Sequence, residues 1–405
     1  MRWYALVLLL VGCVESAQVL GPDDAGIVPP ESDAQIDAQV PRDDGRMPMP
    51  GVSDVSAGGA HSCAIVGGAL SCWGDGTEGA LGTGPSGDRL VPARVGTASD
   101  WRAIEAGQGM TCGLRDGAVW CWGTNELGQL GLGDREPRRS PAEVTLPGAA
   151  TLVRASREFV CAILEGGELL CWGANIEGQL ARADAYPGAD GLTPQRIASE
   201  LRFRDVCTGQ GHGCAIATDG SLWCWGRNTE GQLGLGPDVP RQLREPMRVG
   251  TDVDWASLAC GMSHTCGLRQ DGTLWCWGDD FSGQIGITRG SRFDVPTRVG
   301  EDAGWSEIAT YVFHTCGVKD DGTLWCWGRG IEGQLGLGDI DDRNRPTRVD
   351  DRTDWARVSV GWFHTCAQRT DGSVWCTGEN GDGRLGVGDP DRRDVFTEVQ
   401  GIGVE

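Results

Sequence analysis

The stretch Cys-Trp-Gly-Arg-Gly-Ile-Glu-Gly-Gln-Leu-Gly at residues 326–336 is one of seven near copies of the phrase Cys-Trp-Gly-x-x-x-x-Gly-x-Leu/Ile. Residues 121–131 and 224–234 repeat it most closely. The seven copies begin at Cys72, Cys121, Cys171, Cys224, Cys276, Cys326 and Cys376. A period of about 50 residues is typical of solenoids, arrays and propellers. The repeat therefore decides the architecture of the chain.

Each repeat unit contains four short segments of strand-like sequence. In the fifth unit we predict strands over 255–260, 264–268, 273–277 and 295–299. Short strands at regular spacing, separated by turn residues, favour all-β structure, and no segment shows a sustained helical period. Four strands in each of seven units predict an all-β fold, a seven-bladed β-propeller of four-stranded blades.

A tight hairpin joins the second and third strands of every unit. Cys112 and Cys121 are symmetric about Asp116-Gly117, and Asp-Gly favours a two-residue type I′ turn. The two cysteines then face each other at a non-hydrogen-bonded pair, where side chains are closest. We predict seven such disulfides, with free buried thiols as the alternative. The pairs are Cys63/Cys72, Cys112/Cys121, Cys161/Cys171, Cys214/Cys224, Cys266/Cys276, Cys316/Cys326 and Cys366/Cys376.

Cys207 and Cys260 lie outside these hairpins, on the first strands of units four and five. They form an inter-blade disulfide if those strands are adjacent. Their positions differ by one residue in register, so the two side chains could also face opposite ways. Zinc is a weaker alternative because the spacing within the repeat is not Cys-x-x-Cys. The sequence leaves open whether the two cysteines pair.

The N-terminus resembles an export signal. Arg2 precedes an apolar run over 3–11 that is too short to span a bilayer. The run ends in Leu10-Val11-Gly12-Cys13, which resembles the lipobox of bacterial lipoproteins. The resemblance implies cleavage before Cys13 and lipidation of that residue. An ordinary secretory signal cut near Ala17 is the alternative. Export agrees with 17 cysteines, which would be unusual in a reduced cytosolic protein.

Three regions follow from this organisation. Residues 1–12 are the predicted signal peptide, and 13–50 are the lipidated cysteine with an Asp-, Pro- and Ala-rich tether. The tether lacks the apolar residues needed to offset chain entropy, so we expect it to be disordered. Residues 51–405 form the propeller. We expect a monomer anchored by lipid in the bacterial cell envelope, at the outer membrane or cell surface.

The units resemble the regulator of chromosome condensation repeat family. The resemblance rests on Ala-Gly-Gly-Ala-His-Ser-Cys at 57–63, Asp-Gly-Thr-Leu-Trp-Cys-Trp-Gly at 271–278 and Glu-Gly-Gln-Leu-Gly at 332–336. It covers about 51–405 and implies a seven-bladed propeller. Thr377 departs from the usual tryptophan and Ala181 from the usual glycine. The family's nuclear founder exchanges nucleotide on a small GTPase and docks on chromatin, partners that an exported lipoprotein does not meet.

The five histidines share one repeat position, two residues before the first hairpin cysteine. They are His61, His212, His264, His314 and His364, with Met110 and Phe159 in the other units. A metal needs several converging ligands, whereas equivalent positions in seven blades form a wide ring. We therefore predict no metal and no cofactor, and expect each histidine to hydrogen-bond the backbone of its own blade. The chain lacks a Ser-His-Asp order, a phosphate loop and a zinc-protease motif, so we predict that it is not an enzyme.

Function is expected where the units differ. In units six and seven the turn before the histidine is bulky: Tyr311, Val312, Phe313, Trp362 and Phe363. Apolar residues on adjacent exposed turns suggest a surface that binds an unknown protein partner. The alternative is that they fold inward and plug the central channel. A net charge of −22 argues against nucleic acid as the partner. A carbohydrate- or cell-wall-binding module is the second interpretation.

Overall fold

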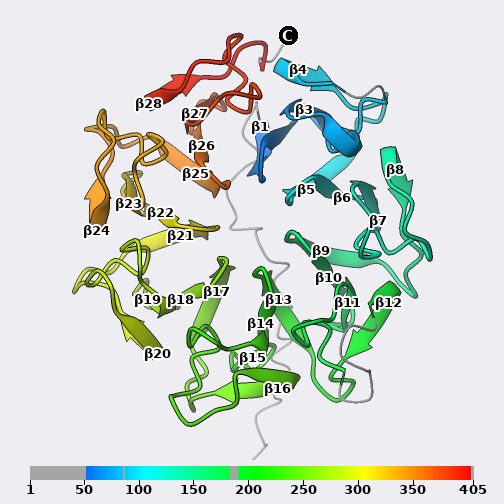
Figure 1. Cartoon of the computed structure of the whole chain (residues 1–405), viewed down its shortest axis with the longest axis vertical. Coiled ribbons are helices and arrows are strands. Elements are labelled where there is room, and N and C mark those ends of the chain that lie inside the picture. The colour runs from blue at the N-terminus through cyan, green and yellow to red at the C-terminus, as the bar shows by residue number, and fades with distance from the viewer. Residues whose placement is uncertain (1–51, 85–86, 183–189, 403–405) are drawn as a thin grey trace, which may run out of the picture. The chain divides into compact units, whose positions relative to one another are not determined.

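The computed structural model describes residues 52–84, 87–182 and 190–402. The predicted signal peptide, Cys13 and the tether lie outside these residues. Seven four-stranded antiparallel sheets follow one another around a ring (Figure 1), and each uses four strands that are consecutive in the sequence. The predicted fold class, a seven-bladed β-propeller, is confirmed.

The four strands of each blade follow the chain from the channel outwards. Blade one contains β1 (Val52–Ala57), β2 (His61–Val66), β3 (Ala69–Gly74) and β4 (Arg89–Arg94), with a 3-10 turn η1 (Thr77–Gly79); blade two β5 (Trp101–Ala106), β6 (Met110–Arg115), β7 (Ala118–Gly123) and β8 (Arg138–Glu143); blade three β9 (Ala150–Ala155), β10 (Phe159–Leu164), β11 (Leu169–Gly173) and β12 (Gly191–Ile197). Blade four contains β13 (Phe203–Thr208), β14 (His212–Ala217), β15 (Leu222–Arg227) and β16 (Gln242–Val249); blade five β17 (Trp255–Cys260), β18 (His264–Arg269), β19 (Leu274–Asp279) and β20 (Arg292–Arg298). Blade six contains β21 (Trp305–Thr310), β22 (His314–Lys319), β23 (Leu324–Gly328) and β24 (Arg343–Arg348); blade seven β25 (Trp355–Val360), β26 (His364–Arg369), β27 (Val374–Gly378) and β28 (Arg393–Glu398).

The hairpin between the second and third strands of each blade has the predicted turn. In blade two, Asp116 and Gly117 both adopt positive φ, 47° and 75°, as a type I′ turn requires. This turn places Cys112 opposite Cys121, with 4.1 Å between the two Cα atoms. All seven predicted in-blade disulfides are present, and their cysteines are fully buried.

The apolar cores lie between neighbouring blades. Trp172 of blade three, for example, packs with Val119 and Leu130 of blade two. Its indole N–H donates to the main-chain carbonyl oxygen of Gln129 at 3.0 Å. The equivalent tryptophans of blades one, two, four, five and six make the same bond across a blade boundary. The repeated tryptophan therefore joins adjacent blades, and its position in the blade core agrees with the sequence.

The repeated histidines bind the next blade, so the expectation that each bonds its own blade's backbone is wrong. Their Nε2 atoms lie beside hydroxyl oxygens in five pairs: His61 with Thr111, His212 with Thr265, His264 with Thr315, His314 with Thr365, and His364 with Ser62. Each hydroxyl donates its own proton to a main-chain carbonyl, as Thr265 does to Gln232 at 2.9 Å. The hydroxyl must therefore accept from Nε2–H, which places a proton on Nε2. Burial lowers the pKa of all five histidines, so this is the only ring proton of a neutral histidine at pH 7.

The hydroxyl is missing from the two blades that follow a unit without histidine. Met110 of blade two is followed in the next blade by Val160, and Phe159 of blade three by Gly213, at the position that threonine or serine holds elsewhere. The two positions, one on each side of a blade boundary, therefore change together within this single chain. Polar pairs and apolar pairs are alternative ways to fill the same buried space.

Blades one and seven close the ring without sharing a strand. The last strand, β28, pairs with β27 of its own blade. Closure instead relies on the usual inter-blade contacts, with Trp73 donating to the carbonyl of Arg384 at 2.9 Å. Arg384, which stands where blades two to six have glutamine, adds a bond to the carbonyl of Gly59 and an ion pair with Glu379 at 2.7 Å.

Candidate functional site

The central channel contains a cavity of about 130 Å³. Its walls are the first strands of all seven blades, β1, β5, β9, β13, β17, β21 and β25. These strands are the inner edges of their sheets, so one side of each backbone has no neighbouring strand to bond. Side chains in the channel wall form hydrogen bonds with some of these unpaired backbone groups.

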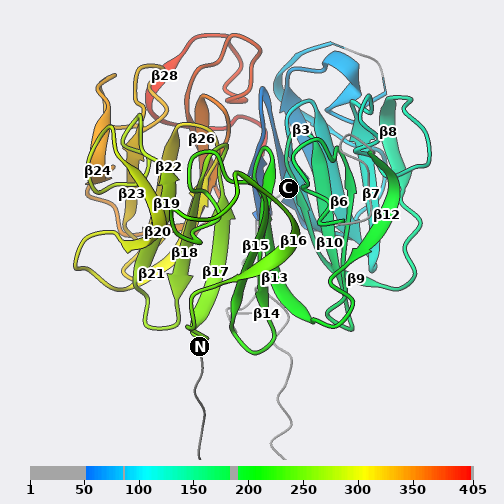
Figure 2. The ribbon, with the colours of Figure 1, turned by 60° about the horizontal axis from the view of Figure 1, so that its bottom comes forward.

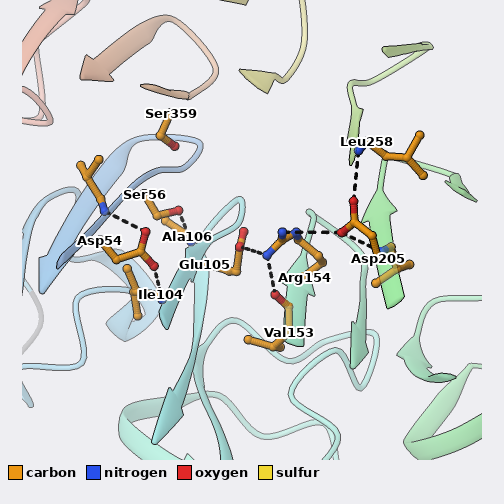
Figure 3. Close-up of polar contacts among 12 residues, drawn as sticks. Asp54, Ser56, Ile104, Glu105, Ala106, Val153, Arg154, Asp205, Leu258 and Ser359 are labelled. Carbon is orange, nitrogen blue, oxygen red and sulfur yellow. Dashed lines mark hydrogen bonds and ion pairs between the residues drawn. The ribbon is translucent and has the colours of Figure 1, made fainter. Parts of the chain in front are cut away.

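Aspartate and serine side chains cap the inner strand edges (Figure 3). Asp54 accepts the backbone N–H of Ile104 from the next blade at 3.0 Å, and Asp205 accepts that of Leu258 at 3.1 Å. Ser56 accepts the N–H of Ala106 at 2.9 Å. Each bond connects one blade to the next across the channel wall. These polar residues thus have a structural role that explains their place in the cavity.

The charges of the channel compensate one another. Arg154 lies 2.7 Å from the carboxylate of Glu105 and 3.9 Å from that of Asp205, and Arg357 lies 3.5 Å from Asp54. Within the described part of the chain, no group of three or more His, Cys, Asp or Glu residues could hold a metal ion. The charged and polar side chains of the channel wall thus hold neighbouring blades together.

Cys207 and Cys260 form a disulfide in this wall, with 5.3 Å between their Cα atoms. The one-residue difference in register does not separate them. Side-chain-to-backbone hydrogen bonds between blades in this wall join a position on one inner strand to the position one residue later on the inner strand of the next blade. Cys207 occupies the strand position of Ser56, and Cys260 that of Ala106. The disulfide replaces the Ser56-to-Ala106 type of hydrogen bond with a covalent bond between blades four and five.

Replacing this disulfide by the serine link of blades one and two gives a graded stability test. Removing a cross-link between residues 53 apart should cost about 4 kcal/mol in C207A/C260A by the chain-entropy relation. In C207S/C260A the introduced hydroxyl can accept the N–H of residue 260, which should restore about 1 kcal/mol. Denaturant unfolding followed by tryptophan fluorescence measures both. Equal midpoints for the wild type and both variants would show that the cross-link contributes nothing.

The second candidate site is the face of the ring that carries the predicted aromatic patch. Seen from the side (Figure 2), the strands run between two faces, so the first and third connections of every blade reach the same face. There the rings of Phe313 and Phe363 stack with centroids 6.4 Å apart, and Trp362 stacks on Phe363 at 5.5 Å. The Arg329 guanidinium lies over both phenylalanine rings, at 5.3 and 5.7 Å. We call Phe313, Trp362, Phe363 and Arg329 the aromatic cluster.

The other two predicted contact residues lie deeper. Tyr311 lines the central cavity, and burial raises the pKa of its hydroxyl well above the usual value. Val312 is only 8% exposed. Their backbone joins blades five and six, because Met262 N–H donates to the carbonyl of Tyr311 at 2.6 Å. The structure thus brings three of the five predicted side chains together at the surface and directs Tyr311 into the channel wall.

Sequence reasoning missed three exposed apolar residues at one loop position on the same face. Ile176 of blade three is 57% exposed, Phe281 of blade five 74% and Ile331 of blade six 46%, all in loops between third and fourth strands. The available signal was the loop position itself, where other units carry Thr77, Glu126, Thr229 or Gly381. Together with the aromatic cluster, Phe281 and Ile331 extend the apolar surface over three adjacent blades, whereas Ile176 lies apart in blade three.

The eight disulfides indicate that the protein folds in an oxidising environment. A separate finding concerns membranes: none of the helices within 52–84, 87–182 and 190–402 is long and apolar enough to cross one.

Comparisons with known proteins agree with the geometry. The RCC1-like domain profile matches residues 187–404, and the regulator of chromosome condensation (RCC1) repeat matches 68–114 and 116–163. The ultraviolet-B receptor UVR8 of Arabidopsis thaliana is 30% identical over 241 residues, covering 57% of this chain and 54% of that protein. Human protein RCC2 is 38% identical over 90 residues, 22% of this chain and 17% of its own length. The chain thus spans about half, or less, of these curated relatives.

Solved structures share the fold at low sequence identity. Prp20p from Saccharomyces cerevisiae superposes with a TM-score of 0.71 and 22% identity, covering 82% of this chain and 85% of that one. Human WBSCR16 gives 0.70 and 20%, covering 78% and 86%. With its profile matches, its repeated sequence and its ring of seven blades, the chain belongs to the regulator of chromosome condensation (RCC1) repeat family.

Proposed function

We propose that the chain is a protein-binding module of the bacterial cell envelope that contacts its partner through the aromatic cluster. Residues 1–12 serve as the signal peptide, a lipid on Cys13 anchors the protein, and 14–50 tether the propeller, residues 51–405. Tyr311 and Val312 support the contact from below. The function is binding rather than catalysis, and the protein acts as a monomer without a cofactor.

One observation carries this proposal: stacked aromatic side chains remain partly exposed on turns that are small or polar in blades one to four. Blades one and two have Ala60 and Gly109 where blade six has Phe313. Packing of a blade therefore does not require a ring at this position. Aromatic residues that surround an arginine are the side chains most often found at the energetic centre of protein interfaces. Relatives whose printed titles describe protein binding, such as Prp20p with Gsp1p and histones, support the class of function.

The double substitution W362A/F363A should abolish partner binding while leaving the fold intact. Truncating two rings at an interface centre typically costs about 2 to 4 kcal/mol each, so we expect affinity to fall by nearly 1,000-fold or more. Crosslinking capture from native envelope extract, with the full chain as bait, identifies the partner. The affinity of the purified partner for both forms then measures the loss.

The matched control is M247A/V253A, which truncates two apolar side chains that are 43% and 51% exposed and lie away from this face. It should capture the partner as the wild type does. Unchanged affinity in W362A/F363A would rule out the aromatic cluster as the contact. Retention of the wild type on purified peptidoglycan, with no protein captured, would instead support a cell-wall-binding module.

A further inference from the structure

Blades five, six and seven carry a charged residue at the same place on the aromatic face. It directly follows the repeated glycine of the third strand, and it is Asp279, Arg329 or Glu379; blades one and four have Asp75 and Arg227 at this place. Its backbone N–H donates to the residue just before the histidine, at 2.9 Å in all three blades. The three side chains therefore start from equivalent points on adjacent blades.

Two of these three charges are neutralised within the protein. Arg329 pairs with Glu332 at 2.6 Å, and Glu379 pairs with Arg384 at 2.7 Å. Asp279 has no ion pair among the described residues. Its carboxylate accepts the backbone N–H of Phe281 at 3.1 Å and the side-chain amide of Gln284 at 3.0 Å. Both donors are neutral, so the negative charge of blade five is not compensated.

The residue after Asp279 differs from its equivalents in most blades. It is Asp280, at a position where blades two, three, four and seven have asparagine. Its side chain is fully buried, and burial raises its pKa to about 7, so it carries only part of a negative charge at neutral pH. Burial also raises the pKa of Asp279, and the charge of Glu230 of blade four adds to the effect. Both of these neighbours are acidic, so neither compensates the charge of Asp279.

An exposed aromatic ring accompanies the uncompensated charge. Phe281, two residues after Asp279, is 74% exposed, and its backbone N–H is held by the Asp279 carboxylate. A flat ring next to a carboxylate can receive a long cationic side chain, which gains a contact with the ring face and an ion pair together. A bare metal ion fits poorly here, because no group of three metal-binding side chains exists in the described ranges.

We propose that Asp279 and Phe281 receive an arginine or lysine side chain of the protein partner, beside the apolar contact made by the aromatic cluster. This inference rests on the proposed function and adds the chemistry of the partner. The partner presents an apolar anchor to blades six and seven and a cation to blade five. The net charge of −22 favours the approach of such a basic surface.

Selection of peptides on the full chain tests the proposal and does not require an identified partner. The probe is a random library of displayed linear peptides, selected in parallel on the wild type, D279N and D271N. D279N removes the charge but keeps an oxygen for the Phe281 N–H. D271N makes the same charge change at the hairpin on the opposite face of blade five, where Asp271 accepts the N–H of Thr273 at 3.0 Å. The D271N variant thus controls for total charge.

We expect wild type and D271N to enrich the same peptides, with arginine or lysine next to an aromatic or aliphatic residue. D279N should lose the enrichment of the basic residue. Replacing that residue by alanine in the most enriched peptide should weaken binding about fivefold on the wild type, the upper range for an exposed ion pair, and leave D279N unaffected.

The outcomes separate this inference from the proposed function. Peptides without a basic residue that still require Trp362 and Phe363 would overturn the cation site and leave the aromatic contact standing. Equal loss in D279N and D271N would show that total charge alone attracts basic peptides, which also overturns the site. If the peptides selected on the wild type were identical in composition to the unselected library, both the cation site and the proposed protein-binding function would be contradicted.

Discussion

Lowering the pH from 7 to 5 should destabilise the propeller by about 8 kcal/mol through His61, His212, His264 and His314 together, and further through His364, a loss comparable to the total stability of a typical domain. Burial lowers the pKa of His212, His264 and His314 to about 3 and that of His61 to about 4, and it lowers the pKa of His364 strongly. Denaturant midpoints at several pH values, followed by tryptophan fluorescence, measure the effect.

The direction follows from proton uptake in the two states. A histidine in the unfolded chain binds a proton below about pH 6.5, whereas the buried native histidine stays neutral until about pH 3 to 4. Between these values the unfolded state binds more protons, so stability falls as the pH falls. Each of the four histidines other than His364 contributes about 2 kcal/mol of this loss by pH 5, and His364 acts in the same direction.

One carboxyl group acts in the opposite direction. Burial raises the pKa of Asp280 to about 7, so the native state takes up this proton first and gains about 2 kcal/mol by pH 5. Five histidines outweigh one aspartate, and the net effect remains strongly destabilising. The D280N variant installs the asparagine of four other blades. Between pH 7 and 5 it should therefore lose more of its free energy of unfolding than the wild type does.

The chain supplies its own control for the histidine effect. H212M/T265V copies the Met110 and Val160 pair of blades two and three, and the carbonyl of Gln232 keeps its bond from Trp277 at 2.9 Å. Between pH 7 and 5, the free energy of unfolding of this variant should fall by about 2 kcal/mol less than that of the wild type. An unfolding midpoint that is independent of pH, or an unchanged slope in H212M/T265V, would contradict the account.

The fold was predictable because its determinants are local and repeated seven times. The turn at Asp116-Gly117 fixes a hairpin, and the hairpin fixes the pairing of Cys112 with Cys121, all within ten residues. The period then gives the number of blades. Such short-range geometry follows directly from backbone conformation and strand pairing.

Contacts between blades were harder to predict because they join residues one repeat apart. The hydrogen bond from His212 to Thr265 spans 53 residues, and nothing in one unit shows which side of a blade its neighbour approaches. A signal nevertheless existed, since histidine is always followed in the next unit by threonine or serine, and Met110 by Val160. Comparing each unit with the unit that follows it in the chain would have found these pairs.

The candidate site was predicted only in part for a related reason. Trp362 and Phe363 were identifiable as departures from the repeat, and the structure places them together on one face with Phe313. Tyr311 stands where five other units have glycine, so the alternation of side chains at the turn directs it to the channel. Phe281 was missed because its loop varies in every unit, which hides a single exposed ring.

Refolding without disulfides should fail. Each hairpin disulfide closes a loop of 9 or 10 residues and contributes about 3 kcal/mol by the chain-entropy relation. Seven such bonds together contribute about 20 kcal/mol, more than the net stability of typical proteins, about 5 to 15 kcal/mol. The chain unfolded in denaturant with a phosphine reductant, then returned to native buffer with the reductant present, should remain unfolded by circular dichroism.

The matched experiment returns the same chain to a thiol–disulfide redox buffer, in which the native spectrum should recover. C112A/C121A, which removes one hairpin bond from an otherwise oxidised chain, should fold and lose about 3 kcal/mol. The packing of cysteine as a small apolar residue is retained in the reduced chain, so this comparison isolates the covalent bonds. A reduced chain that unfolds cooperatively near the oxidised midpoint would show that inter-blade packing alone holds the ring, and that the hairpin disulfides are dispensable.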